Sequence, residues 1–223
     1  MTTAVQQPVG LPVREIFTFG EVLVRPLPGG RFQLRHREDA GAAAITERFH
    51  LAEDALEIAR FDDDGNYRPL KTAPNLRRGW NLELPGEKDL RAALDFFYPG
   101  RLAVFLALKA NRFETTPLRE TLGRQTGMYK IAANISDEQL DCLIAGFCRS
   151  DGGCLRTILW KRDSGGAIPS TKLPPEKYDP DYDQALTGGA EPIGANVPLL
   201  CQESCNLLVA ECRKVVKGER TAF

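Results

Sequence analysis

The segment Pro198-Leu-Leu-Cys-Gln-Glu-Ser-Cys-Asn-Leu-Leu-Val-Ala-Glu-Cys-Arg-Lys214 decides how the second half of the chain is expected to fold. Its apolar residues recur at helical spacing, which predicts a helix with Cys201 and Cys205 near its start. Side chains four positions apart face the same way on a helix, and the unpaired N–H groups at a helix start favour thiolates. The segment therefore predicts two thiolates that could hold a metal centre.

A second cysteine pair precedes this segment. Cys148-Arg-Ser-Asp-Gly-Gly-Cys154 follows a predicted helix over 136–147 and comes before the strand-like run Leu155–Trp160. Its two glycines let the backbone come close to a bulky group. Four thiolates from two distant segments could then surround one centre, which would also cross-link the segments.

These four cysteines could hold an iron–sulfur cluster or a zinc ion, form disulfides, or remain free thiols. A structural zinc ion usually takes C-x2-C or C-x4-C knuckles, and neither C-x5-C nor C-x3-C fits them well. Disulfides are disfavoured because residues 1–10 are polar and lack the apolar core of a signal peptide. Free thiols are common in buried cores. The spacing favours a cluster held by Cys148, Cys154, Cys201 and Cys205, and leaves zinc and free thiols open.

The other two cysteines are expected to play different roles. Cys142 lies within the predicted helix over 136–147, which Ser136 and Gln139 begin with a capping box, and is expected to be a small core residue. Cys212 lies about 10 Å along its helix from the preceding cysteine. We therefore expect Cys212 to support the centre or the core rather than to be one of the four ligands.

The cysteine-free N-terminal half predicts a small α+β domain. Strand-like runs over 17–25 and 31–37 flank a hairpin-type turn at Pro26–Gly30. Helices are expected over 45–60, 87–98 and 101–109. The sequence therefore predicts an α+β protein in which this domain is followed by a helix-rich one.

Composition narrows the classes of function. The chain has 223 residues, 43% of them hydrophobic, and a formal net charge of −1. Such a charge gives no case for nucleic acid or a membrane surface as partner, and no apolar run approaches the roughly 18 residues that span a bilayer. The thiols indicate a reducing compartment, so a cytoplasmic location is expected. The proline-rich stretch 161–196 is expected to be a mobile surface loop or a cover for the metal site.

A basic segment over 66–80 contains no acidic residue. Its cations are Arg68, Lys71, Arg77 and Arg78. Clustered guanidinium groups bind carboxylates or phosphates, so an anionic ligand such as a polycarboxylate tetrapyrrole, or a partner protein, would suit them. The alternative is that these cations pair with Asp62–Asp64 and with a neighbouring domain.

The two histidines show no catalytic or metal-binding motif. His36 and His50 are not part of H-x-x-x-H or H-E-x-x-H, and His36 is expected to be a solvated strand end. The sequence also contains no Gly-rich phosphate loop and no G-x-S-x-G elbow. It therefore does not support nucleotide hydrolysis or serine-type acyl transfer.

Several stretches of the chain together suggest a family. They are Ala59–Trp80, Arg119–Tyr129, Gly153–Trp160 and Cys201–Leu208. These stretches resemble the C-terminal region found fused to CbiX-like sirohydrochlorin cobaltochelatases, which consists of a stabilising domain and a four-iron four-sulfur domain. The resemblance implies a stabilising-type α+β domain over 14–128 and a cluster-binding domain over 129–223, here as a stand-alone protein.

The resemblance also implies a cofactor and a role. It implies that Cys148, Cys154, Cys201 and Cys205 ligate a [4Fe-4S] cluster. Because the chelatase domain is absent from this sequence, we favour a role other than that of an enzyme on its own. We expect electron transfer or accessory work beside a tetrapyrrole or cobalamin-biosynthesis enzyme, with that enzyme or a protein redox partner as the partner. The alternative is an interaction scaffold with a structural cluster or zinc site.

Overall fold

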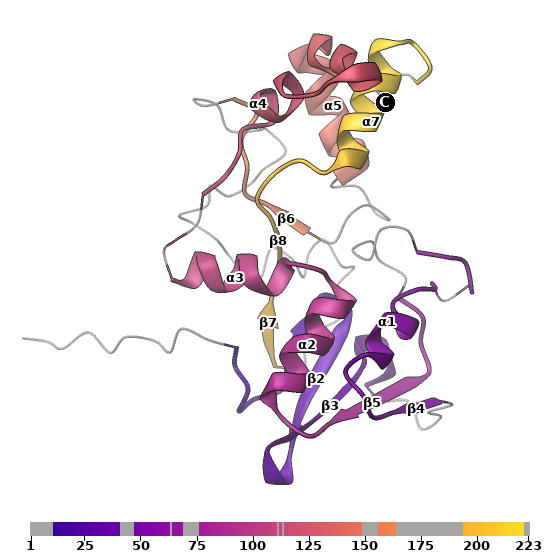
Figure 1. Cartoon of the computed structure of the whole chain (residues 1–223), viewed down its shortest axis with the longest axis vertical. Helices are drawn as coiled ribbons and strands as arrows, with labels where there is room; N and C mark the ends of the chain where they lie inside the picture. Colours follow the sequence, from indigo (N-terminus) through magenta and orange to yellow (C-terminus); the bar gives the residue numbers. More distant parts are fainter. Residues whose placement is uncertain are drawn as a thin grey trace, which may run out of the picture.

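The molecule has a sheet-based part and a helical part, which Figure 1 shows stacked along the long axis. The computed structural model describes residues 11–40, 47–62, 64–68, 76–110, 112, 114–148, 156–163 and 194–220. The predicted α+β class is confirmed, with a sheet domain first and a helix-rich domain after it.

The main sheet of the described residues has six strands in the order β4-β5-β3-β2-β1-β7. They are β1 (Phe17–Phe19), β2 (Val22–Leu27), β3 (Arg31–His36), β4 (Glu47–Phe49), β5 (Trp80–Leu84) and β7 (Ala195–Val197). The β1–β2, β2–β3 and β3–β5 pairs are antiparallel, whereas β4–β5 and β1–β7 are parallel. Because β7 comes from the C-terminal part of the chain, the sheet itself joins the two halves of the sequence.

The predicted hairpin turn is confirmed between β2 and β3. Leu27 pairs with Arg31 across the 3-10 turn η1 (Pro28–Gly30). Gly29 has a φ of 79°, which residues with a Cβ adopt only at a cost. This glycine therefore allows the chain to reverse directly between the two strands.

The helix expected over 45–60 is only partly present. Phe49 of β4 pairs in parallel with Leu82 of β5, and helix α1 covers only Asp54–Ile58; residues 45 and 46 lie outside the described residues. The prediction was wrong for 47–49 because pairing with a neighbouring strand outweighs a weak helical periodicity.

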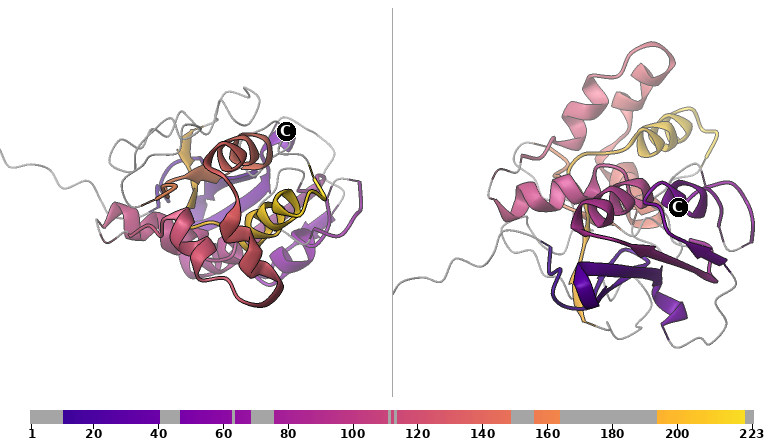
Figure 2. Two further views of the ribbon diagram at one scale, coloured as in Figure 1. Left: turned by 90° about the horizontal axis from the view of Figure 1, so that it is seen from above. Right: turned by 60° about the horizontal axis from the view of Figure 1, so that its bottom comes forward.

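The two helices predicted after residue 86 are confirmed as α2 (Glu87–Phe97) and α3 (Arg101–Lys109). Figure 2 (right) shows α2 and α3 above the strands, so α2 covers one face of the sheet. The ring of Phe97 stacks on Trp80 of β5 with a centroid distance of 5.2 Å. This contact fixes α2 against the sheet.

The helical part begins after residue 116. It contains α4 (Leu118–Gly123), the 3-10 segment η3 (Gly127–Asn134), α5 (Asp137–Cys148) and α7 (Asn206–Val216). The capping box predicted for α5 is confirmed: the Ser136 N–H donates to Gln139 Oε1 at 3.0 Å, and the Gln139 N–H donates to Ser136 Oγ at 3.2 Å. Helix α7 packs against both α5 and η3, and so closes this part of the molecule.

The buried apolar side chains form two clusters, which we call the first core and the second core. The first core includes Phe17, Phe19, Leu34, Trp80, Leu82, Leu94, Phe97, Leu159, Val197, Leu199 and Leu200. The second core includes Leu118, Leu122, Leu140, Leu143, Ile144, Cys148, Ile158, Trp160, Cys201, Leu208, Val209, Cys212 and Val215. The first core therefore takes part of its side chains from the C-terminal half of the sequence.

A parallel two-stranded ribbon lies between the two cores, as Figure 1 shows. It pairs β6 (Arg156–Ile158) with β8 (Leu199–Cys201). Leu199 and Leu200 belong to the first core, whereas Cys201 belongs to the second. The ribbon therefore places Cys201 at the junction of the two cores.

The expectations for the stretch 161–196 and for the domain limits stay predictions. Of the stretch 161–196, residues 164–193 lie outside the described residues. The domain limits 14–128 and 129–223 also stay a prediction, and the second core already includes Leu118. Among the helices that the structure describes, none has the length and apolar character needed to cross a membrane.

Candidate metal centre

Cys201 ends strand β8 and does not lie on a helix. Its carbonyl accepts a hydrogen bond from the Leu159 N–H at 3.0 Å, so its backbone belongs to the ribbon. The prediction that Cys201 and Cys205 share one helix is therefore wrong. Leu199 and Leu200 are buried in the first core, and the segment satisfies its backbone by pairing with β6 rather than by forming a helical turn.

Cys205 is the N-cap residue of α7. Its backbone is extended, with φ −83° and ψ 161°, and its side chain makes no capping hydrogen bond. It is partly exposed and packs against the second core. The start of a helix carries a partial positive charge, which suits a negatively charged group bound beside it. A cysteine at a helix start, as predicted, is thus confirmed for Cys205 alone.

Cys148 is the last residue of α5 and is buried in the second core. Its expected partner Cys154 lies outside the described residues, as does the whole stretch 149–155. The structure therefore places three of the four expected ligands, Cys148, Cys201 and Cys205, in or against the same core.

These three cysteines do not form a complete metal site by themselves. Within the described ranges, no three His, Cys, Asp or Glu side chains are grouped so that they could hold a metal ion. The assignment of Cys148, Cys154, Cys201 and Cys205 as ligands therefore stays a prediction. The chemistry of the donors fits an iron–sulfur cluster, because thiolates in apolar surroundings near N–H donors are its usual ligands.

The sulfur of Cys201 contacts polar groups of Trp160 and Glu203. The indole N–H of Trp160 donates to Cys201 Sγ at 3.3 Å, and the Cys201 thiol donates to the carbonyl of Glu203 at 3.0 Å. Trp160 is almost completely buried. Sequence reasoning missed this residue, because its position at the end of a strand-like run gave no sign that its indole would meet a cysteine.

Cys212 is fully buried in the second core. Burial raises the pKa of its thiol to about 12, although the nearby Arg119 acts in the opposite direction. Cys212 is therefore a neutral thiol at neutral pH, which suits the expected role in the core.

Cys142 is exposed, so the expectation that it is a core residue is wrong. The buried face of α5 carries Leu140, Leu143, Ile144 and Cys148. Because a helix turns 100° per residue, position 142 points away from this face. The same periodicity, applied to the whole helix, would have identified the exposed position.

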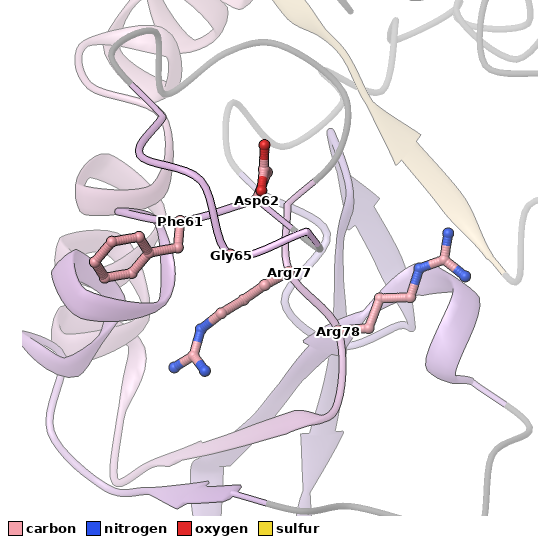
Figure 3. Close-up of a pocket in the computed structure, with 5 residues that line it drawn as sticks. All are labelled: Phe61, Asp62, Gly65, Arg77 and Arg78. Atoms are coloured by element: carbon pink, nitrogen blue, oxygen red, sulfur yellow. The ribbon is translucent and has the colours of Figure 1, made fainter.

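Arg77 and Arg78 of the basic segment help to line an open pocket of about 660 Å³. Its lining residues are Phe61, Asp62, Gly65, Arg77 and Arg78. Figure 3 shows that the guanidinium groups of Arg77 and Arg78 point in different directions. Arg77 pairs with Glu47 at 2.9 Å and Arg78 with Glu38 at 2.6 Å. Both arginines thus have acidic partners, and pairing with Asp62–Asp64 stays a prediction because Asp63 lies outside the described residues.

The other two cations of this segment are placed differently. Arg68 is buried, whereas Lys71 lies outside the described residues. The assignment of Arg68, Lys71, Arg77 and Arg78 to an anionic ligand or a partner stays a prediction.

His36 is buried, with 1% of its surface exposed, so the expectation of a solvated strand end is wrong. It continues the inward-facing alternation of Phe32 and Leu34 along β3. Its Nε2 lies 3.7 Å from Oε1 of the buried Glu21.

Glu21 is the centre of a buried polar cluster that the sequence did not reveal. Its carboxylate accepts a hydrogen bond from the Leu76 N–H at 2.6 Å, and its own N–H donates to the Tyr98 hydroxyl oxygen at 3.0 Å. Burial and the negative charge of Glu21 raise the pKa of Tyr98 above its usual value. These contacts tie together distant segments of the first domain and have a structural role.

Comparison with known proteins identifies both parts of the chain. Residues 11–107 match the DR2241 stabilising domain, and residues 110–214 match the 4Fe-4S iron-sulfur cluster binding domain. No curated protein matched the chain.

The chain is also similar to a solved structure, that of DR2241 from Deinococcus radiodurans. The identity is 29% and the TM-score 0.69, and the similarity covers 92% of this chain and 39% of the other. That protein is described as a multi-domain protein with structural similarity to chelatases and two additional novel domains. The chain thus spans well under half of the length of this relative. The present chain thus consists of a DR2241 stabilising domain followed by a 4Fe-4S cluster binding domain, and its cofactor is a [4Fe-4S] cluster.

Proposed function

We propose that this chain exchanges single electrons with a chelatase-type tetrapyrrole enzyme, through a cluster held by Cys148, Cys154, Cys201 and Cys205. When bound, a [4Fe-4S] cluster supplies a centre that takes up and releases one electron. The observation that carries the proposal is the graded exposure of the described cysteines. Cys148 and Cys201 are buried in the second core, whereas Cys205 is partly exposed at the start of α7.

This difference in exposure among the cysteines suits a cluster that exchanges electrons with a partner protein. Burial at Cys148 and Cys201 keeps water away from the thiolates. Partial exposure at Cys205 leaves one side of the site close to the protein surface, where a second protein can approach. Redox partners usually meet over small, short-lived interfaces, so a single accessible edge is sufficient.

Two features of the chain stabilise negative charge on these sulfur atoms. The start of α7 presents free N–H groups and a partial positive charge at Cys205. The indole N–H of Trp160 donates to Cys201 Sγ. Both suit a negatively charged cluster and favour its more negative, reduced form.

The description of the similar solved structure supports the choice of partner. DR2241 of Deinococcus radiodurans is described as similar in structure to chelatases. This supports a chelatase-like enzyme of tetrapyrrole or cobalamin biosynthesis as the partner. The pocket beside Arg77 and Arg78 supports docking of an acidic surface or of a tetrapyrrole carboxylate, once Glu47 and Glu38 are displaced as their partners.

A structural role for the cluster is the second candidate, and the ribbon favours it. Cys201 ends β8 at the junction of the two cores, so a centre that holds Cys201 would also brace that junction. Such a chain would serve as an interaction scaffold.

The experiment that separates the two candidates is a redox titration of the anaerobically purified protein, followed by electron paramagnetic resonance. Electron transfer predicts a cluster that dithionite reduces reversibly, with the spectrum restored after reoxidation. A cluster that cannot be reduced, or that is lost on the first reduction, would contradict electron transfer and support the structural role.

A further inference from the structure

The chain contains two tryptophans, and their buried indole groups have different acceptors. Trp80 and Trp160 are both 1% exposed. The indole N–H of Trp80 donates to the carbonyl of Arg77 at 2.6 Å, whereas that of Trp160 donates to the sulfur of Cys201 at 3.3 Å. A buried indole N–H requires an acceptor, and a neutral thiol is a poor one. The contact of Trp160 is therefore much better satisfied when the sulfur of Cys201 carries negative charge.

The backbone holds Trp160 in this position from two sides. On one side, the ribbon sets Ile158 opposite Cys201, and the Leu159 N–H donates to the Cys201 carbonyl at 3.0 Å. On the other side, the Leu118 N–H of α4 donates to the Lys161 carbonyl at 2.7 Å. The residues on both sides of Trp160 are thus fixed, so its indole is held toward Cys201.

The contacts of Cys201 with Glu203 and Trp160 respond differently to loss of the thiol proton. The contact with the Glu203 carbonyl uses the S–H as donor, so it exists only while Cys201 is protonated. The contact with Trp160 uses sulfur as acceptor and becomes stronger when the sulfur is a thiolate. A metal ligand is a thiolate. The Trp160 contact is therefore the one that ligation by Cys201 would keep.

We propose that Trp160 is a positioning residue for the cluster: its indole N–H donates to the ligating sulfur of Cys201, orients that ligand and raises the reduction potential. This inference rests on the proposed function, in which Cys201 is a ligand. Hydrogen bonds to cluster sulfur stabilise the reduced state, which carries one more negative charge. Removing the donor should therefore make the cluster harder to reduce.

The test compares Trp160→Phe with the matched variant Trp80→Phe in the cluster-loaded protein. Each variant removes one buried indole, but only the first removes a donor to sulfur. At a fixed poise near the wild-type midpoint, we expect Trp160→Phe to lower the ratio of reduced to oxidised cluster by roughly tenfold, which is roughly 59 mV for one electron. Trp80→Phe should keep the wild-type ratio. A Trp160→Phe protein with full iron content and an unchanged midpoint would overturn the proposal.

A second measurement uses the cluster-loaded wild-type protein, and the variants serve only to assign its signals. Because the chain has two tryptophans, the nitrogen-15 spectrum of the wild-type protein shows two indole N–H signals, which the two variants assign even without iron. On reduction of the loaded wild-type protein, we expect the Trp160 signal to shift or broaden strongly and the Trp80 signal to stay. Equal behaviour of the two signals would contradict the proposal.

Failure of this inference and failure of the proposed ligand set give different results. If Cys201→Ser keeps its full iron content, Cys201 is not a ligand and the proposed ligand set fails together with the inference. If Cys201→Ser loses its iron while Trp160→Phe keeps the wild-type midpoint, the ligand set stands and only the role of Trp160 is rejected.

Discussion

The first core and the second core differ in what stabilises them. The first core is built on a sheet and packs large rings against each other, such as Trp80 on Phe97 and Phe19 edge-on to Tyr98. The second core has short helices around the ribbon and includes two of the expected ligands, Cys148 and Cys201. We therefore expect hydrophobic packing to be sufficient for the first core, whereas the second would be completed by the proposed cluster.

Ion pairs at the edge of the second core support the same distinction. Arg119 of α4 pairs with Asp137 at the start of α5 and donates to the Ile135 carbonyl at 2.8 Å. Arg162, just after β6, pairs with Asp141 of α5 at 3.2 Å. Such partly exposed pairs orient helices and contribute little free energy. They orient the helices around the proposed centre but would not replace it.

The largest expected effect is that of removing the cluster. Chelation under anaerobic conditions should reduce amide protection in α5 and α7 by about tenfold or more, because the cross-link between their segments is lost. Protection in β2 and β3 should change little. Hydrogen exchange followed by mass spectrometry measures both regions in one sample. Equal loss in the two regions, or loss in neither, would contradict the difference between the cores.

A smaller effect is expected at the contact between the first core and the ribbon. Gly20 has a φ of 61°, and a Cβ there would lie 2.8 Å from side-chain atoms of both Leu199 and Tyr98. Gly20→Ala should therefore add about 1–3 kcal/mol of overpacking to the cost of a left-handed alanine. The matched control is Gly29→Ala, where φ is 79° and nothing lies within 4 Å of the added atom. Denaturant unfolding measures the free energy of unfolding of both variants. Equal losses of this free energy would show that Leu199 does not pack closely against this turn.

The smallest expected effect is a change in acid sensitivity. The hydrogen bond from Arg119 lowers the pKa of the Asp137 carboxyl below its usual value. A carboxyl whose pKa is lowered on folding adds stability above its unfolded pKa of about 3.9, and this stability is lost as the pH falls through the folded pKa. The free energy of unfolding of Asp137→Asn should therefore depend less on pH in this acidic range than that of the wild type. Denaturant unfolding at a series of pH values measures this dependence. An equal dependence in variant and wild type would contradict this role of the Arg119 pair.

The sequence predicted the elements that depend on local signals. The turn at Pro28–Gly30 follows from its proline and glycines, and α5 begins at the capping box of Ser136 and Gln139. Helices α2 and α3 follow from clear periodicity between turn residues. In each case, a few neighbouring residues carry enough information to determine the conformation.

Elements that depend on distant partners were not predictable in this way. Residues 47–49 form a strand because β5 lies beside them, and Cys201 is extended because β6 pairs with its segment. The donor to Cys201, Trp160, is likewise brought there by the register of the ribbon. For the candidate site, the sequence predicted which cysteines to consider and a helix start at Cys205, but not the strand that carries Cys201.

The most direct test of the account is the iron and acid-labile sulfide content of Cys201→Ser beside that of Cys142→Ser. Cys142 is an exposed thiol of α5, whereas Cys201 ends the ribbon between the two cores. With both variants purified anaerobically, we predict about four iron atoms per chain in Cys142→Ser, as in the wild type, and a strong loss of iron and sulfide in Cys201→Ser. Full iron and sulfide in Cys201→Ser would contradict the claim that the ribbon delivers a cluster ligand to the second core.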